Sequence, residues 1–343
     1  MLKKLKIPVI FAIIVIFLYF VGIMRQNSKS GKSRKKLEIV NVSYDPTREL
    51  YEKYNKLFME YYRQKYGQDV KISQSHGGSG SQARSVIEGL DADVVTLALE
   101  NDVALLEKVD LLEKGWVNKF PGSSSPYTST IVFLVRKGNP KNIKDWNSLT
   151  EKGIKVITPD PKSSGGACWN FLAAWSYGRE KFGNDEHKIQ NFVKNIYDNV
   201  AVMDSGARAA TTTFVENNQG DVLIAWENEA IATIREYPEK YEIVYPSVSI
   251  LAQPTVAVVD KVAKSNGTYQ ISTEYLKYLY SEKAQEIIAE SGYRPYNQKI
   301  LKKYENKFDL KMKLTKIDEF GGWKKVYEKF FNEGALFDKI YEN

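Results

Sequence analysis

Apolar positions from Leu37 onward recur in two patterns that replace one another along the chain. Short continuous or alternating apolar runs predict strands, and apolar residues spaced by three or four predict helices between them. The first strands are expected at Leu37–Ser43, Asp69–Ser75 and Asp91–Leu99. A helix that begins after Asp45-Pro46 has its apolar face at Leu50, Tyr54, Leu57, Phe58 and Tyr61. This alternation indicates an α/β fold.

The second half of the chain repeats the alternation. Strands are expected at Thr130–Pro140 and Ile154–Pro161, and a further strand ends at Trp226. The helix after Pro161 has one apolar face, made of Cys168, Phe171, Leu172 and Trp175. The extended, proline-interrupted segment Glu242–Asp260 is typical of a chain that passes between two lobes, and the last eighty or so residues are expected to be mainly amphipathic helix.

The N-terminal region differs from this pattern. The apolar run Ile7–Met24 follows a short basic segment and is long enough either for a secretory signal or for a membrane-spanning helix. No small-residue cleavage motif follows, since the next residues are Arg25-Gln26-Asn27, so we favour an uncleaved anchor and a flexible tether at Gln26–Lys36. A cleaved signal is the alternative. The basic residues after the run outnumber those before it, so the positive-inside rule does not clearly favour an exported body.

The net charge of +7 does not indicate a nucleic-acid surface. Nine of the 49 Lys and Arg residues lie in residues 1–36, which contain no acid, so the remaining 40 face 42 Asp and Glu. The near-neutral body excludes an extended basic patch as the organising feature. The single cysteine, Cys168, allows no intramolecular disulfide, so cysteine content does not identify the compartment.

Small and turn-forming residues gather at the places where predicted strands end and helices begin. They occur at Tyr44–Pro46, His76–Gly80, Ser163–Gly166 and Ser205–Ala207. Ligands of open parallel sheets bind at this edge, where helix starts present unpaired N–H groups. Serine hydroxyls and the Trp226 indole add further neutral donors. Such a set suits a small, fully ionised oxyanion without a salt bridge.

Each of these elements also has a structural interpretation. A Ser/Gly turn before a helix is commonly only a cap, and Asp45 before Pro46 could serve its own helix. The sequence contains no P-loop, no G-x-S-x-G elbow and no zinc-like spacing, so we expect neither an enzyme nor a metal or cofactor. One alternative is an NAD(P)-dependent oxidoreductase, because Gly78-x-Gly80-x-x-Ala83 follows a strand and Asp102 lies near the end of the next one.

Seven segments together resemble the sulfate-binding protein family, the solute receptors of sulfate/thiosulfate ABC importers. They are NVSYDPTRELYEKYN, SHGGSGSQA, PYTSTIVFLVRKGNPK, ITPDPKSSGGA, DSGARAATTTFVE, GDVLIAWENEA and FGGW. The resemblance extends from about Leu37 to the C-terminus. It implies a two-lobed periplasmic-binding-protein fold of type II, in which mostly parallel sheets flanked by helices hold the ligand between them. The expected divisions are a signal or anchor segment and tether (1–36), lobe I (37–126), lobe II (127–250) and a return to lobe I with C-terminal helices (251–343).

The resemblance also implies a sulfate-binding shell made of backbone and side-chain donors. Its members would be the N–H of Asp45, with the carboxylate turned away, the Ser79 hydroxyl, the hydroxyl and N–H groups of Ser164, Gly165 and Gly166, the N–H of Ala207 and the indole of Trp226. Relatives often carry Arg where this chain has Cys168. We expect a monomeric extracytoplasmic receptor for sulfate or thiosulfate, whose lobes close about a hinge near Tyr127 and Ala252 and which serves a membrane ABC permease and binds no nucleic acid. A membrane-tethered sulfate sensor without a transport role is the alternative.

Overall fold

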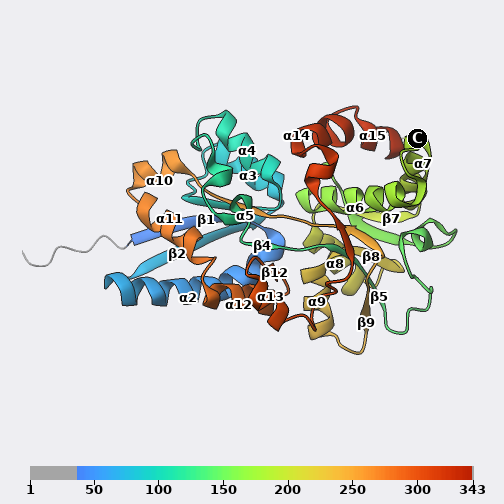
Figure 1. Cartoon of the computed structure of the whole chain (residues 1–343), viewed down its shortest axis with the longest axis horizontal. Helices are drawn as coiled ribbons and strands as arrows, with labels where there is room; N and C mark the ends of the chain where they lie inside the picture. Colours follow the sequence, from blue (N-terminus) through green and yellow to red (C-terminus); the bar gives the residue numbers. More distant parts are fainter. Residues whose placement is uncertain (1–36, 342–343) are drawn as a thin grey trace, which may run out of the picture. The chain divides into compact units, whose positions relative to one another are not determined.

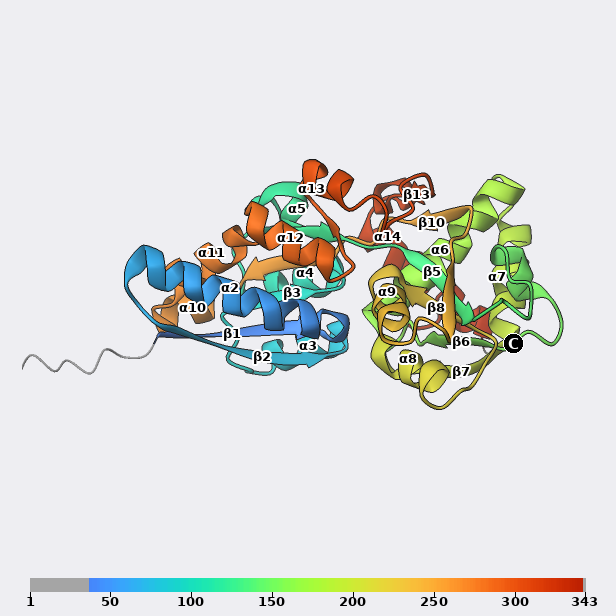
Figure 2. The ribbon, with the colours of Figure 1, turned by 90° about the horizontal axis from the view of Figure 1, so that it is seen from below.

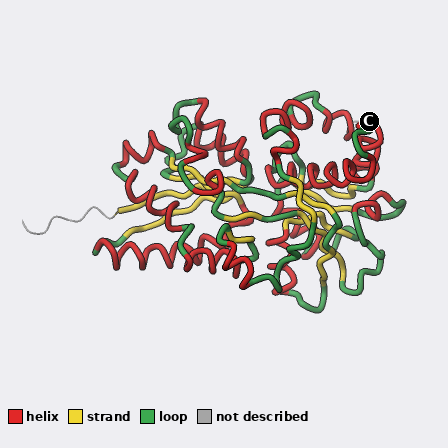
Figure 3. The backbone as a smooth tube through the Cα atoms, viewed as in Figure 1, coloured by secondary structure: helices red, strands yellow, loops and turns green. Residues whose placement is uncertain are grey.

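The computed structural model describes residues 37–341, which contain two main β-sheets with helices around each (Figures 1 and 3). The first is four-stranded, in the order β11-β3-β1-β2. Its strands are β1 (Leu37–Tyr44), β2 (Val70–Gly77), β3 (Val94–Leu97) and β11 (Thr255–Val258). The helices that connect or flank them are α2 (Arg48–Tyr66), α3 (Ser79–Ile87), α4 (Glu100–Lys108), α10 (Asp260–Asn266) and α11 (Tyr269–Tyr278). We call this sheet and its helices lobe I.

The second sheet is five-stranded, in the order β7-β6-β8-β5-β9, and with its helices is called lobe II. Its strands are β5 (Ile131–Arg136), β6 (Val156–Pro159), β7 (Val200–Asp204), β8 (Val222–Trp226) and β9 (Tyr241–Val244). The main helices are α6 (Gly165–Phe182), α7 (Glu186–Asp198), α8 (Ala207–Val215) and α9 (Glu227–Glu236). In Figure 2, α8 and α9 lie on one side of this sheet and α6 and α7 on the other.

Each sheet contains one strand that runs against the others, and both of these strands begin where the chain crosses between lobes. β11 is antiparallel to β3, and β5 is antiparallel to β8 and β9, whereas β1 and β3, β6 and β7, and β6 and β8 are parallel. The crossing segments pair with each other through Ser129 and Ala252, which exchange two backbone hydrogen bonds of 2.9 Å. The expected two-lobed α/β fold with mostly parallel sheets is confirmed.

Apolar residues are buried on the faces that the sequence pattern predicts. Val42, Val95 and Leu97 of the lobe I sheet pack against Ala83 and Val86 of α3. In lobe II, the predicted face of α6 is entirely buried: Cys168, Phe171, Leu172 and Trp175 are at most 2% exposed. Nearly every residue in the first three turns of α6 is buried, which explains why it is one of the most apolar helices.

The C-terminal helices pack differently from the expectation that residues 251–343 belong to lobe I. β13 (Lys313–Thr315) pairs with β10 (Val248–Ile250), and α15 (Leu336–Tyr341) packs on α7. Phe330 and Phe337 contact Phe171 of α6 with ring centroids 5.5 and 5.8 Å apart. In Figure 1, α14 (Trp323–Val326) and α15 accordingly lie beside α6 and α7. An amphipathic helix pattern shows that a face is buried but not which lobe covers it, so the sequence misplaced these helices.

No helix within residues 37–341 is long and apolar enough to cross a membrane. The predicted anchor at Ile7–Met24 and the tether that follows it lie outside the described residues.

A buried ion pair links the lobes beside the crossing segments. Arg294, in β12 (Arg294–Pro295), donates from Nε and Nη2 to the two carboxylate oxygens of Glu227 at 2.6 and 2.8 Å. β12 pairs with β4 (Tyr127–Thr128), while Glu227 is the first residue of α9. The Arg294 and Glu227 side chains are 6% and 0% exposed, so each charge is stabilised by the other in place of water.

We expect Glu227→Gln to destabilise the protein by about 3–5 kcal/mol, because it leaves the Arg294 guanidinium buried without a counterion. Urea denaturation followed by circular dichroism measures the change. Glu52→Gln is the matched control: it breaks the exposed Lys56–Glu52 pair on α2 and should cost only about 0.3–0.5 kcal/mol. Equal losses in the two variants would contradict the importance of the buried pair.

Candidate functional site

The first turn of α6 is the centre of the candidate site. Ser164 precedes the helix with extended backbone angles (φ −116°, ψ 113°), so its hydroxyl could cap the helix, yet it makes no capping hydrogen bond. Gly165 and Gly166 follow as the first helical residues, and no carbonyl of the same helix can accept from their N–H groups. The turn therefore keeps backbone donors and one hydroxyl uncommitted to its own helix.

Three other chain segments begin helices in the same way. The residues before the 3₁₀ helix η1 (Asp45–Thr47), before α3 and before α8 are Tyr44, Gly78 and Gly206, and none of them provides a side-chain cap. By contrast, Asp185 caps α7 and Ser281 caps α12 (Glu282–Glu290) through their side chains. No side-chain cap is therefore present at these helix starts, and at Gly78 and Gly206 glycine has no side chain to provide one.

Contacts between the lobes bring these helix starts together. A Cβ atom on Gly78, before α3, would lie 3.2 Å from the Ser163 carbonyl oxygen, and a Cβ on Gly165 would lie 3.1 Å from Asp102 Oδ2. α8 packs against η1, and Ala207 lines a small cavity together with Trp226. The Tyr44 ring of lobe I packs against the Trp226 ring of lobe II, with centroids 5.6 Å apart. The seven predicted residues thus share one region.

Trp226, the last residue of β8, is only 1% exposed and points its indole toward the first turn of α6. A Cβ on Gly166 would lie 3.1 Å from Trp226 Nε1 and 3.5 Å from Ser164 Oγ, so glycine is what permits this approach. The indole N–H donates to the Gly166 carbonyl oxygen at 3.1 Å. The sequence predicts a donor at this position, and the structure shows that the donor is engaged within the protein.

Ser79, the first residue of α3, is 2% exposed and is also engaged. Its Oγ accepts from the Ala98 N–H at 3.0 Å and donates to Asp102 Oδ2 at 2.5 Å. The Asp45 carboxylate lies 3.5 Å from Nη2 of Arg48, the first residue of α2.

Two cations near the site are already paired with carboxylates. Arg208, next to Ala207 on α8, donates from Nη2 to both oxygens of Glu49 at 2.8 and 2.9 Å, which joins lobe II to lobe I. Lys162 Nζ lies 2.6 Å from Asp338. The arrangement therefore offers neutral dipoles around the first turn of α6, while the charges of Arg208 and Lys162 are compensated by Glu49 and Asp338.

Two buried carboxylates near these helix starts were not predicted as parts of an anion site. Asp102 on α4 is 3% exposed, and burial raises its pKa to about 6, although the Ser79 hydroxyl and the Arg84 charge lower it. Burial likewise raises the pKa of Glu229 on α9 to about 7, opposed mainly by Arg208, which lies 3.7 Å away. No local signal could have found them, because Asp102 meets Ser79 across 23 residues of sequence.

The dinucleotide interpretation of the Gly78–Ala83 turn gains no support from this geometry. The motif needs an acidic residue free for the ribose and open backbone at the glycine turn. Here the Asp102 carboxylate accepts from Ser79 within the turn itself, and the Ser163 carbonyl approaches Gly78 from the other lobe. Both features leave that turn committed to protein contacts.

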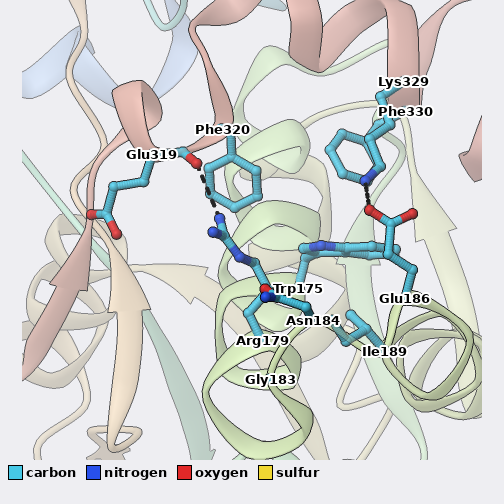
Figure 4. A pocket seen from close by; sticks show the side chains of 10 residues that line it. All are labelled: Trp175, Arg179, Gly183, Asn184, Glu186, Ile189, Glu319, Phe320, Lys329 and Phe330. Atoms are coloured by element: carbon cyan, nitrogen blue, oxygen red, sulfur yellow. Dashed lines mark hydrogen bonds and ion pairs between the residues drawn. The ribbon is translucent and has the colours of Figure 1, made fainter.

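A pocket of about 310 Å³ elsewhere in lobe II does not share any residue with the predicted site (Figure 4). It lies between α6, α7 and the C-terminal segments, and it contains two cations. Arg179 donates to the Glu319 carbonyl oxygen at 3.2 Å, and Lys329 pairs with Glu186. Because both cations already have acceptors, this pocket is a poorer anion site than the first turn of α6.

Within residues 37–341, no group of three or more His, Cys, Asp or Glu side chains is placed to hold a metal ion. Cys168 is fully buried, its thiol lies 3.5 Å from the Pro161 carbonyl oxygen, and burial raises its pKa. The expectation that it acts as a small apolar core residue agrees with this position. His187 is exposed on α7.

Comparison with known proteins places the chain in a protein family. Residues 44–294 match the model of the bacterial extracellular solute-binding proteins. The chain is 57% identical over 308 residues to the sulfate-binding protein of Escherichia coli K12. The matched region covers 89% of this chain and 93% of that relative. It is 44% identical over 314 residues to the thiosulfate-binding protein of Pseudomonas aeruginosa. That match covers 91% of this chain and 94% of the relative.

Solved structures agree with these relationships. The sulfate-binding protein SubI from Mycobacterium tuberculosis H37Rv is 32% identical, superposes with a TM-score of 0.77 and covers 86% of this chain and 100% of its own. The periplasmic binding protein AfuA from Actinobacillus pleuropneumoniae shares the fold, with a TM-score of 0.63 at 18% identity. The match covers 89% of this chain and 97% of AfuA. The chain therefore belongs to the bacterial extracellular solute-binding protein family, in the group that contains the sulfate-binding and thiosulfate-binding proteins.

Proposed function

We propose that this protein is an extracytoplasmic receptor that binds sulfate, or alternatively thiosulfate, between its lobes and delivers it to a membrane ABC permease without chemical conversion. The observation that carries the proposal is the meeting of uncapped helix starts from both lobes around Gly165 and Gly166. The names of its relatives, sulfate-binding and thiosulfate-binding proteins matched over more than nine tenths of their length, support the same ligand class.

The proposed shell consists of Asp45, Ser79, Ser164, Gly165, Gly166, Ala207 and Trp226. Helix starts carry a partial positive charge, and their N–H groups form strong hydrogen bonds to an anion once water is excluded. Because Arg208 and Lys162 are paired with Glu49 and Asp338, the proposal is that dipoles hold the ion rather than a salt bridge. Lobe closure about the Ser129–Ala252 crossing would bring the donors to the ion from both sides.

Anion selectivity tests the proposal directly. At pH 6 we expect titration calorimetry of the purified protein to show binding of sulfate and thiosulfate and much weaker binding of phosphate. Phosphate carries protons at this pH, and a shell that only donates leaves its O–H groups without an acceptor. Binding of phosphate as tightly as sulfate would contradict the donor-only shell.

The indole donor can be removed singly. The indole N–H donates to the Gly166 carbonyl oxygen in the structure and would turn to the ion in the bound form. We therefore expect Trp226→Phe, which removes this hydrogen bond, to reduce sulfate affinity by about 1–3 kcal/mol, roughly a 5- to 150-fold rise in Kd. Trp146→Phe is the matched control: Trp146 is equally buried in lobe II and its indole also donates to a backbone carbonyl, that of Val248, at 2.8 Å. It should leave the Kd unchanged, and an unchanged Kd in Trp226→Phe would remove Trp226 from the shell.

Partnership with a permease separates transport from a tethered sensor. We expect the protein, cross-linked in membranes in the presence of sulfate, to co-purify with the membrane subunits of an ABC importer. The Glu49–Arg208 pair joins the lobes beside the site, so Arg208→Gln should weaken the closed form and reduce the cross-linked yield. Sulfate binding without any recovered importer subunit would favour the sensor.

A further inference from the structure

Lobe I contains a cavity of about 610 Å³ that shares no residue with the proposed sulfate shell. It is lined by the C-terminal half of α2, by the segment 119–121 and by the second half of α11 as far as Ser281. Small-molecule sites in proteins have volumes of about 300–1,000 Å³. This lobe I cavity is therefore large enough for an organic ligand, and its lining decides which kind.

Aromatic rings form the apolar part of this lining. Tyr61 of α2 stacks on Tyr278 of α11, with ring centroids 3.9 Å apart and planes inclined by 16°. Phe120 and Tyr280 are also nearly parallel, with centroids 6.4 Å apart. The Tyr61 and Tyr280 hydroxyls already donate to acceptors within the protein. These tyrosines therefore offer a ligand mainly their ring surfaces.

The lysines of the lining differ in whether they are paired. Lys65 Nζ lies 2.8 Å from Glu274 Oε1, and Lys119 Nζ lies 2.9 Å from Asp260 Oδ1. Burial acts to raise the pKa of Glu274, but hydrogen bonds, that of Lys65 foremost, and nearby positive charge together lower this pKa below its usual value. Lys277 is exposed and, within residues 37–341, has no carboxylate at ion-pair distance. Three ammonium groups thus face two carboxylates, which leaves a surplus of one positive charge.

This lining defines the shape and the charge of a suitable ligand. A planar ring system packs favourably against aromatic side chains. A single anionic group on that ring system can accept from the Lys277 ammonium, which has three N–H donors. The surplus positive charge disfavours a metal ion, and a polyanion would find only one unpaired lysine. An ion as small as sulfate would leave most of the volume to water.

We propose that the lobe I cavity is a second ligand site, which binds a small organic monoanion that contains an aromatic ring, with the ring against Tyr278 and Tyr280 and the anionic group on Lys277. This inference goes beyond the proposed function and does not depend on it, because the cavity and the sulfate shell have no residue in common. Binding in the cavity must therefore persist when the shell is saturated with sulfate.

Titration calorimetry of the full-length protein with 2-naphthoate, in the presence of saturating sulfate, tests the proposal. We expect saturable binding of one equivalent. 2-Naphthamide has the same rings without the charge and should bind about tenfold more weakly, because the charge-assisted hydrogen bond from Lys277 is lost. Cyclohexanecarboxylate keeps the charge without the aromatic rings and should also bind more weakly than 2-naphthoate. Absence of saturable binding at millimolar 2-naphthoate, or equal affinity for the amide, overturns the proposal.

Lys277→Gln removes the surplus charge at an exposed position, so the variant should fold like the wild-type protein. We expect it to raise the Kd for 2-naphthoate about tenfold, to abolish the preference over 2-naphthamide and to leave the Kd for sulfate unchanged. Lys329→Gln is the matched control, because Lys329 lines the 310 Å³ pocket of lobe II and lies over the Trp175 ring there. A rise in Kd with Lys329→Gln and none with Lys277→Gln would place the probe in lobe II and overturn the assignment.

Two substitutions of Tyr280 separate its ring from its hydroxyl. Both Tyr280→Leu and Tyr280→Phe lose the hydrogen bond to the Pro121 carbonyl oxygen, but only the first also removes the ring. We expect Tyr280→Leu to raise the Kd for 2-naphthoate roughly 2- to 12-fold and Tyr280→Phe to leave it unchanged. Equal effects of the two would overturn the assignment of an aromatic ligand. Sulfate binding without 2-naphthoate binding overturns this proposal alone, whereas 2-naphthoate binding without sulfate binding supports it and overturns the proposed function.

Discussion

The close packing of the first turn of α6 is the constraint on which the rest of the site depends. Gly166 faces the Trp226 indole and Gly165 faces Leu99 and Asp102 at distances that leave no room for a larger side chain without movement of a neighbour. The turn is held from behind by Phe171 and Trp175, which lie in a core shared with the C-terminal helices. A helix start with uncommitted N–H groups is useful only if it cannot shift, and this core supplies that rigidity.

The charge arrangement around this turn follows a consistent physical rule. Arg208 and Lys162 are satisfied by Glu49 and Asp338, so they cannot reach a ligand without breaking an existing ion pair. Asp102 and Glu229 are buried instead of solvated, and burial disfavours their charged forms. The region therefore becomes least negative when these carboxyl groups are protonated.

Links between the lobes have different strengths at different places. The Glu227–Arg294 pair is fully buried beside the crossing segments and persists only with excellent geometry, which the two short hydrogen bonds provide. The Glu49–Arg208 pair lies at the exposed edge of the site, where solvent weakens it. This contrast suits a molecule in which the crossing region stays intact while the facing surfaces separate, because the weak contact is the one that opening must break.

The sequence by itself determined the strands, the helices and the helix starts that carry the candidate site. Period-two and period-3.6 patterns identified β1, α2 and α6, and the Ser/Gly turns before α3, α6 and α8 indicated where backbone would be exposed. These features are local, since each depends on residues within one or two turns of the chain. The tertiary structure alone decided that Phe330 and Phe337 pack on α6 in lobe II, and that Asp102 meets Ser79. Such contacts join residues far apart in the chain, and an apolar face or a lone carboxylate carries no record of the partner that will cover it.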